Sequence, residues 1–124
     1  MNMSESIDAA RIGDIERTAD GLALLRFRFA PDQPVFAGHF PGHPILPGIF
    51  QMEMAKVAAE LTLGNSVAVR EITKAKFRRP ILPDETIRVE LKLSENSETT
   101  QAHAVFMVEG QPAGETILQL MRAT

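Results

Sequence analysis

Three residues between positions 39 and 53 carry groups suited to moving a proton beside a carbonyl. His39 has an imidazole that titrates near neutral pH and can act as a base. Glu53 falls inside the apolar run of a predicted helix, where burial favours its proton-donating form unless a charged group reaches it. Gly48 opens that helix, where main-chain amides lack internal partners and a bare Cα lets a substrate oxygen approach. A base, an acid and an amide that stabilises an oxyanion suit proton removal next to a carbonyl.

Other interpretations of these residues stay open at this point. A histidine and a glutamate fourteen positions apart are unrelated in most chains. His43 is typical of a solvated loop, and His103 of a packed or surface position on a strand. A zinc site from His39, His43 and Glu53 is disfavoured, since the helical ligand pairing of metalloproteases is missing. The chain has no cysteine, no glycine-rich phosphate motif and no serine nucleophile elbow, which argues against thiol chemistry, nucleotide hydrolysis and serine hydrolysis.

The whole chain is typical of one globular domain. It has 124 residues and a formal net charge of −3, without the basic excess expected of a nucleic-acid-binding protein. There is no apolar run of membrane-spanning length and no secretory signal pattern, so we expect a cytoplasmic protein that binds neither nucleic acid nor membrane. Residues 1–10 are polar and are expected to form a flexible N-terminus, frayed or weakly helical, before a domain over 11–124.

The elements that must position the three residues follow from the hydrophobic periodicity. Residues 15–30 predict two strands around the turn pair Asp20-Gly21, with Ala23, Leu25, Phe27 and Phe29 as the apolar face. Five prolines between 31 and 47 exclude regular structure there. A helix apolar on nearly every side is predicted from Pro47 to Gly64. Strands follow over 67–77, 87–93, 101–109 and 115–121, so the expected α+β fold is a curved antiparallel sheet wrapped around one central helix.

The stretch GHFPGHPILPG, with Glu53 five residues beyond its last glycine, resembles the motif of the β-hydroxyacyl-acyl-carrier-protein dehydratases. A later segment, KAKFRRPILPDETIRVELKL, is similar to the family's second recognisable region. The resemblance covers most of the chain from Phe36 onward. It implies a single hotdog domain, in which the sheet wraps the helix, and a homodimer or trimer of dimers with sheets joined edge to edge.

The resemblance also implies a role for each motif residue. His39 of one subunit would take the α-proton of a 3-hydroxyacyl thioester, and Glu53 of the partner would protonate the leaving hydroxyl. The Gly48 amide would stabilise the enolate, and Phe40 and Pro47 would contact the substrate. The product would be a trans-2-enoyl thioester. No cofactor or metal is expected beyond the phosphopantetheine that carries the substrate on an acyl carrier protein, or the coenzyme A that replaces it.

The chain departs from the family pattern at several positions. The N-terminal segment of the PHRYPFLLVDR type has no counterpart, and no tyrosine is present to form a gate. Val57 stands four residues after Glu53, where the family commonly has glutamine. These departures leave two rivals: a thioesterase or CoA-thioester hydratase on the same fold, and a non-catalytic acyl-binding or assembly subunit.

A local excess of positive charge suggests a partner surface. Residues 70–79, REITKAKFRR, carry five basic side chains against one acidic side chain. Because carrier proteins are acidic, Arg78 and Arg79 are expected to help dock one. The alternative is a solvated strand face, or pairing with the acidic residues at positions 84, 85 and 90.

Overall fold

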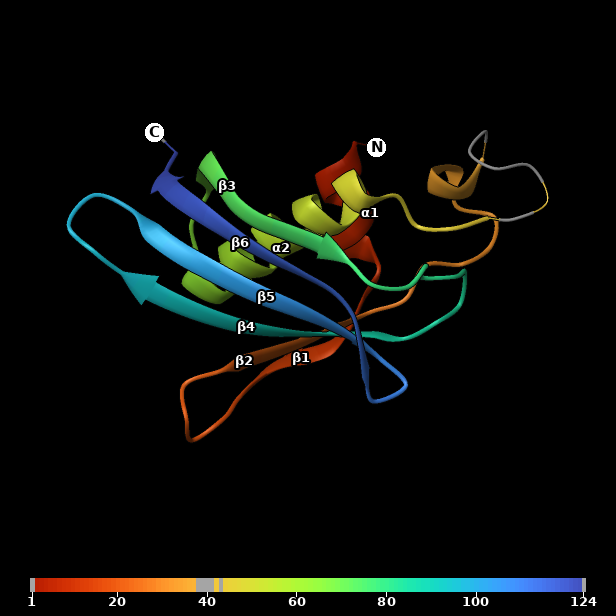
Figure 1. Cartoon of the computed structure of the whole chain (residues 1–124), viewed down its shortest axis with the longest axis horizontal. Helices are drawn as coiled ribbons and strands as arrows, with labels where there is room; N and C mark the ends of the chain where they lie inside the picture. The colour runs from red at the N-terminus through yellow and green to blue at the C-terminus, as the bar shows by residue number, and fades with distance from the viewer. Residues whose placement is uncertain (1, 38–41, 43, 124) are drawn as a thin grey trace.

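One long helix lies against the concave face of a six-stranded antiparallel sheet (Figure 1). This computed structural model describes residues 2–37, 42 and 44–123. The helices are α1 (Met3–Ala9) and α2 (Gly48–Leu63), with a 3-10 turn η1 (Pro34–Phe36). The strands are β1 (Arg11–Arg17), β2 (Ala23–Phe27), β3 (Val67–Phe77), β4 (Ile87–Glu95), β5 (Thr100–Val108) and β6 (Gln111–Arg122). They are ordered β1-β2-β4-β5-β6-β3, so β1 and β3 are the edges.

The core forms where alternate strand residues meet α2. Leu25 and Phe27 on β2, and Val89 and Leu91 on β4, point inward and are fully buried. Their strands pair in the register Leu25↔Val89 and Ala23↔Leu91, so the apolar positions of both strands share one face. The apolar face predicted for residues 23–29 is confirmed. So is the expected α+β architecture of a sheet around a buried helix.

Helix α2 begins and ends close to the proline and the glycine that predict its limits. Pro47 has extended backbone angles (φ −63°, ψ 150°) and is the N-cap, so the helix begins at Gly48, one residue later than expected. Gly64 ends it with φ 80°, a left-handed conformation that glycine adopts without a Cβ penalty. No acidic residue and no side-chain cap occupy the first turn. The positive end of the helix is therefore available to a ligand.

Two elements differ from the sequence-based expectation. Residues 3–9 of the expected flexible N-terminus form α1, which packs on α2 and buries Ile7 completely. Strand β6 begins at Gln111, whereas residues 109–114 were expected to form a longer turn. The β5–β6 hairpin is closed by Glu109 and Gly110, both with positive φ (52° and 76°), which matches the tight primed turns of hairpins.

Edge strand β3 is irregular and presents apolar side chains to its surroundings. Its pairing with β6 shifts register between Val69 and Glu71 and again between Ile72 and Lys74, as at a β-bulge. Val69, Ile72 and Phe77 are 41%, 49% and 47% exposed, unusually high values for large apolar side chains along one strand. No helix among the described residues is long and apolar enough to cross a membrane.

Candidate active site at the start of α2

The segment before α2 is held against the end of β3. The amide of Leu46 donates to the carbonyl of Ile81 at 2.8 Å, and the amide of Arg78 donates to the carbonyl of Ala113 at 2.8 Å. The first bond fixes the segment before α2 beside the chain that leaves β3, and the second ties that chain to β6. Within the described part of the chain, no hydrogen-bond acceptor is found for the Gly48 amide. That N–H is therefore available to polarise a carbonyl oxygen.

Gly48 has a packing role as well as an exposed amide. A Cβ built on Gly48 would lie 2.7 Å from the ring of Phe77, closer than real Cβ contacts. The ring of Phe77 on β3 therefore lies directly on the first turn of α2. Only glycine allows this approach while Phe77 keeps its position.

A cavity of about 460 Å³ opens beside this contact. It is lined by Ile45, Leu46, Pro47, Gly48, Gln51, Phe77, Arg78, Arg79 and Pro80. The lining thus combines the helix start with apolar groups and two guanidinium side chains. A second, more apolar cavity of about 420 Å³ lies on the other side of Pro47, between α1, η1 and α2.

Glu53 lies on α2 at the interface with α1 and makes two contacts. The hydroxyl of Ser4 donates to Glu53 Oε2 at 2.6 Å, and Lys56 Nζ lies 3.6 Å from the same oxygen. The Glu53 side chain is 25% exposed. A cation therefore lies within ion-pair distance of this carboxylate.

The structure describes some of the motif residues and leaves others out. Pro47 and Gly48 line the first cavity, whereas Glu53 lies about one and a half turns further along α2. His39 and Phe40, expected as the base and a substrate contact, lie outside the described residues, as does His43. The structure thus places the amide and the carboxylate on one helix and leaves the position of the imidazole as a prediction.

The two arginines expected to dock a carrier have unlike surroundings. Arg79 forms a bidentate pair with Glu85, with nitrogen–oxygen distances of 3.0 and 2.6 Å. Arg78 is exposed and forms no ion pair with any described residue. For Arg79, the intramolecular alternative weighed above is the one observed; Arg78 keeps its charge available.

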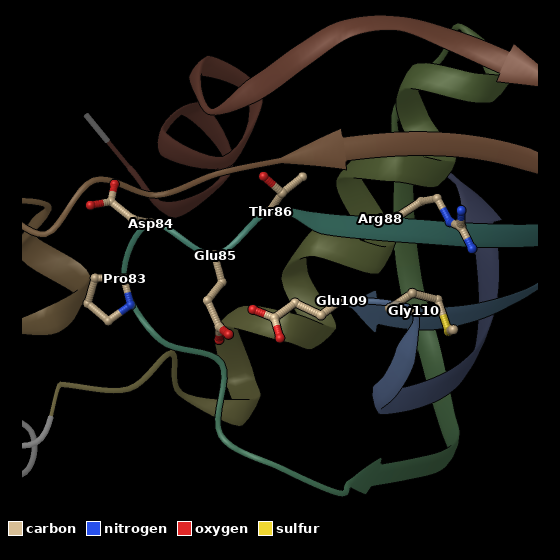
Figure 2. A pocket seen from close by; sticks show the side chains of 8 residues that line it. Pro83, Asp84, Glu85, Thr86, Arg88, Glu109 and Gly110 are labelled. Carbon is tan, nitrogen blue, oxygen red and sulfur yellow. The ribbon is translucent and has the colours of Figure 1, made fainter.

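Glu85, the acidic partner of Arg79, also lines a cavity at the start of β4. This cavity of about 470 Å³ is lined by Pro83, Asp84, Glu85, Thr86, Arg88, Met107, Glu109 and Gly110. Figure 2 shows the side chains of Glu85 and Glu109 pointing toward one another across it. Its acidic lining suits neither a carboxylate nor an oxyanion. No cluster of three metal-ligating side chains occurs in residues 2–37, 42 and 44–123.

The second histidine–glutamate pair lies on the outer face of the sheet. His103 Nε2 is 2.6 Å from Glu115 Oε2, and Lys74 Nζ is 3.1 Å from Glu115 Oε1. The hydrogen bond from His103, followed by that from Lys74, lowers the pKa of Glu115 below its ordinary value. These residues come from β5, β6 and β3 and lie on the face opposite α2, so the pair has no access to the helix start.

Three residues at the site were missed in the sequence: Ser4, Lys56 and Phe77. A signal for Ser4 was available, because Asn2 followed three residues later by Glu5 is a helix-capping pattern. The Asn2 side chain does accept a hydrogen bond from the Glu5 amide at 2.8 Å. Lys56 could have been found from its i,i+3 spacing to Glu53. Nothing local predicts that Phe77 covers Gly48.

Comparisons with known proteins find dehydratases among the proteins similar to this chain. The family model that matches is ApeI-like, described as the ApeI dehydratase, over residues 15–115. The 3-hydroxyacyl-(acyl-carrier-protein) dehydratase FabZ of Magnetococcus marinus is 33% identical over 121 residues, covering 90% of this chain and 78% of that protein. Its counterpart in Granulibacter bethesdensis is 32% identical, covering 90% of this chain and 70% of that protein.

Solved structures share the fold over nearly the whole chain. The dehydratase heterocomplex ApeI:P from Xenorhabdus doucetiae matches with a TM-score of 0.75 at 25% identity, covering 90% of this chain and 96% of that one. The Escherichia coli PaaI protein matches with a TM-score of 0.67 at 15% identity, which shows the fold alone. The hotdog fold expected from the sequence is confirmed.

Proposed function

Because the chain belongs to the ApeI-like dehydratase family, we propose that it eliminates water from 3-hydroxyacyl thioesters to give trans-2-enoyl thioesters. The observation that carries this proposal is the geometry of α2. The uncapped Gly48 amide stands at the helix start, and the Glu53 carboxylate follows on the same helix at the spacing of the dehydratase motif. The FabZ relatives act on acyl groups linked to a carrier protein, and we extend that substrate class to this chain.

The reaction needs one proton removed and one supplied. His39 takes the α-proton, and the electron pair moves toward the thioester carbonyl, whose oxygen accepts a hydrogen bond from the Gly48 amide. Glu53 in its protonated form then gives its proton to the 3-hydroxyl group as the carbon–oxygen bond breaks. Water leaves, and exchange with solvent resets both side chains. One amide of this kind is worth about 3 kcal/mol of barrier, and the chemistry as proposed needs no cofactor.

The site is proposed to be shared between two subunits joined through β3. That strand is a sheet edge whose exposed large apolar side chains, Val69, Ile72 and Phe77, favour coverage by another chain. Two copies paired along this edge would form one continuous sheet. His39 of one copy would then act with Glu53 of the other, in a homodimer or trimer of dimers. The cytoplasmic location expected from the sequence stays a prediction.

One assay separates this function from its rivals. The protein is incubated with a 3-hydroxyacyl thioester of an acyl carrier protein while enoyl absorbance and free thiol are followed together. The proposal expects enoyl formation without thiol release, lost in His39→Ala and in Glu53→Gln. Thiol release without enoyl formation would instead support a thioesterase. No product from folded wild-type protein would support a non-catalytic acyl-binding subunit.

A mixing experiment tests whether the site is shared. Inactive His39→Ala and Glu53→Gln proteins are combined and allowed to exchange subunits, which mass spectrometry of isotope-labelled copies verifies. A shared site predicts that mixed dimers recover part of the wild-type rate, because each retains one intact pair. Verified exchange with no recovery would place the site within a single chain.

Carrier docking is proposed at Arg78, with Lys76 as a second exposed cation near the end of β3. Arg78 lines the cavity at the start of α2, so a carrier held there would present its phosphopantetheine arm to the Gly48 amide. Arg78→Glu is expected to raise KM for carrier-linked substrate severalfold and to leave KM for a small thioester mimic unchanged. Lys92→Glu, a charge reversal at an exposed position on β4, is the matched control. Equal KM values for Arg78→Glu and the control would contradict docking at this site.

A further inference from the structure

We propose that Ser4 on α1 is a positioning residue for Glu53, an inference that rests on the proposed function. The Ser4 hydroxyl donates to Glu53 Oε2 at 2.6 Å, a short bond across the contact between α1 and α2. No other hydrogen bond to the Glu53 side chain is found in the part of the chain that the structure describes. Ser4 therefore determines which carboxylate oxygen is held and which one is left to react.

The two oxygens of Glu53 differ in their surroundings. Ser4 and Lys56 both contact Oε2, Lys56 at 3.6 Å, beyond the distance of a good hydrogen bond. Among the described residues, no group bonds Oε1. A carboxyl group fixed through one oxygen can present the other to a substrate hydroxyl in a single orientation. Reactions that depend on proton transfer lose rate when the donor is free to rotate away.

Helix α1 is anchored well enough to hold this contact. The Asn2 side chain caps it by accepting from the Glu5 amide, and Ile7 is fully buried beneath it. The chain continues directly into β1, where the amide of Arg28 donates to the carbonyl of Ala10 at 3.1 Å. A seven-residue helix is not stable alone, so its position is fixed by these tertiary contacts.

One turn further along α2, Lys56 at i+3 carries a donor, but its Nζ stays 3.6 Å from Oε2, beyond the distance of a good hydrogen bond. Val57 lies at the i+4 position from Glu53, is buried and has no donor. The other ionisable groups near the α1–α2 contact are Glu5 and Asp8 on α1 and Glu60 on α2. They are acids, and none could neutralise or hold a carboxylate. The buried sheet residues are apolar apart from Thr116, whose hydroxyl donates to the carbonyl of Lys74, so the hydroxyl that holds Glu53 comes from α1.

The test uses two substitutions of equal size at one position. Ser4→Thr keeps a hydroxyl, and Ser4→Val replaces it with a methyl group. We expect Ser4→Val to lower kcat for enoyl formation about tenfold, because the carboxyl group is no longer held in one orientation, with KM unchanged within about twofold. Ser4→Thr should retain kcat within about threefold. Ser6→Ala, at a serine of the same helix without a side-chain bond to Glu53, should match wild type.

A double substitution shows whether Ser4 acts through Glu53. In the Glu53→Gln background, Ser4→Val should change the residual rate less than about twofold, because the group it positions has gone. Equal kcat for Ser4→Val and Ser4→Thr, with an active wild type, would overturn the positioning role and leave the function intact. A wild type that forms no enoyl product would overturn both.

Discussion

Two carboxylates of this chain, Glu53 and Glu115, each have a lysine within ion-pair distance, yet their surroundings differ. Glu115 is held on both oxygens, by His103 on one and Lys74 on the other, across three strands of a rigid sheet. Among the described residues, Glu53 is held on one oxygen only, at a contact between two helices close to the start of α2. A carboxylate with both oxygens bound has little capacity left for a substrate. The partly bound carboxylate is the one suited to chemistry.

The comparison also separates His39 from His103. His103 lies 2.6 Å from a carboxylate oxygen of Glu115, but it is on the outer face of the sheet, opposite α2. His39 belongs to the proline-rich stretch that leads into α2. We expect His39→Ala to lower the rate of enoyl formation at least about 100-fold, through loss of the base. His103→Ala should stay within about twofold of wild type. Steady-state rates of the two purified variants check this, and equal losses would contradict the assignment.

The Gly48–Phe77 contact gives the next largest effect, on stability. Gly48→Ala places a Cβ against the Phe77 ring and forces that half-exposed ring to move, at about 1–2 kcal/mol of unfolding free energy. Thermal melts should show a Tm about 5 °C lower. In a Phe77→Ala background the same substitution should cost much less, because the overlapping atoms are absent. Equal costs in the two backgrounds would show that the ring is not the obstacle.

The His103–Glu115 pair on the outer face of the sheet should make the stability of the fold depend on pH. The pKa of folded Glu115 lies below its ordinary value of 4.5, because His103 and Lys74 bind the ionised form. Its contribution to stability is therefore complete above about 4.5 and is lost as pH falls through the lower folded pKa. The Tm difference between wild type and Glu115→Gln should be largest near pH 7 and should narrow below about pH 4. A difference that stays constant with pH would contradict the linkage.

The smallest expected effect concerns the two neighbouring arginines. Arg79 is paired with Glu85 and is one-third exposed, so Arg79→Ala should cost about 0.5–1 kcal/mol of unfolding free energy. Arg78→Ala should leave the denaturant midpoint unchanged, because the exposed Arg78 makes no ion pair with a described residue. Chemical denaturation of both variants measures this, and a larger loss for Arg78→Ala would reverse the division between a structural and a docking arginine.

The sequence predicted the parts of this molecule that depend on local rules. Proline before a helix and glycine after it located α2 within one residue, and period-two alternation located β2 and β4 with the correct faces inward. Contacts between elements far apart in the sequence could not be predicted from such local patterns. The hydroxyl that holds Glu53 lies 49 positions away, in a segment whose short polar sequence has no hydrophobic period. The approach of Phe77 to Gly48 likewise depends on how β3 ends beside α2.

The pair Glu53→Gln and Glu115→Gln gives the most direct test of which carboxylate performs the chemistry. Each substitution removes one charge and preserves size, and each protein is assayed for enoyl formation from the same 3-hydroxyacyl thioester. The account predicts a loss of at least about 100-fold for Glu53→Gln and a rate within about twofold of wild type for Glu115→Gln. A Glu53→Gln protein that is folded and still turns over at the wild-type rate would contradict it.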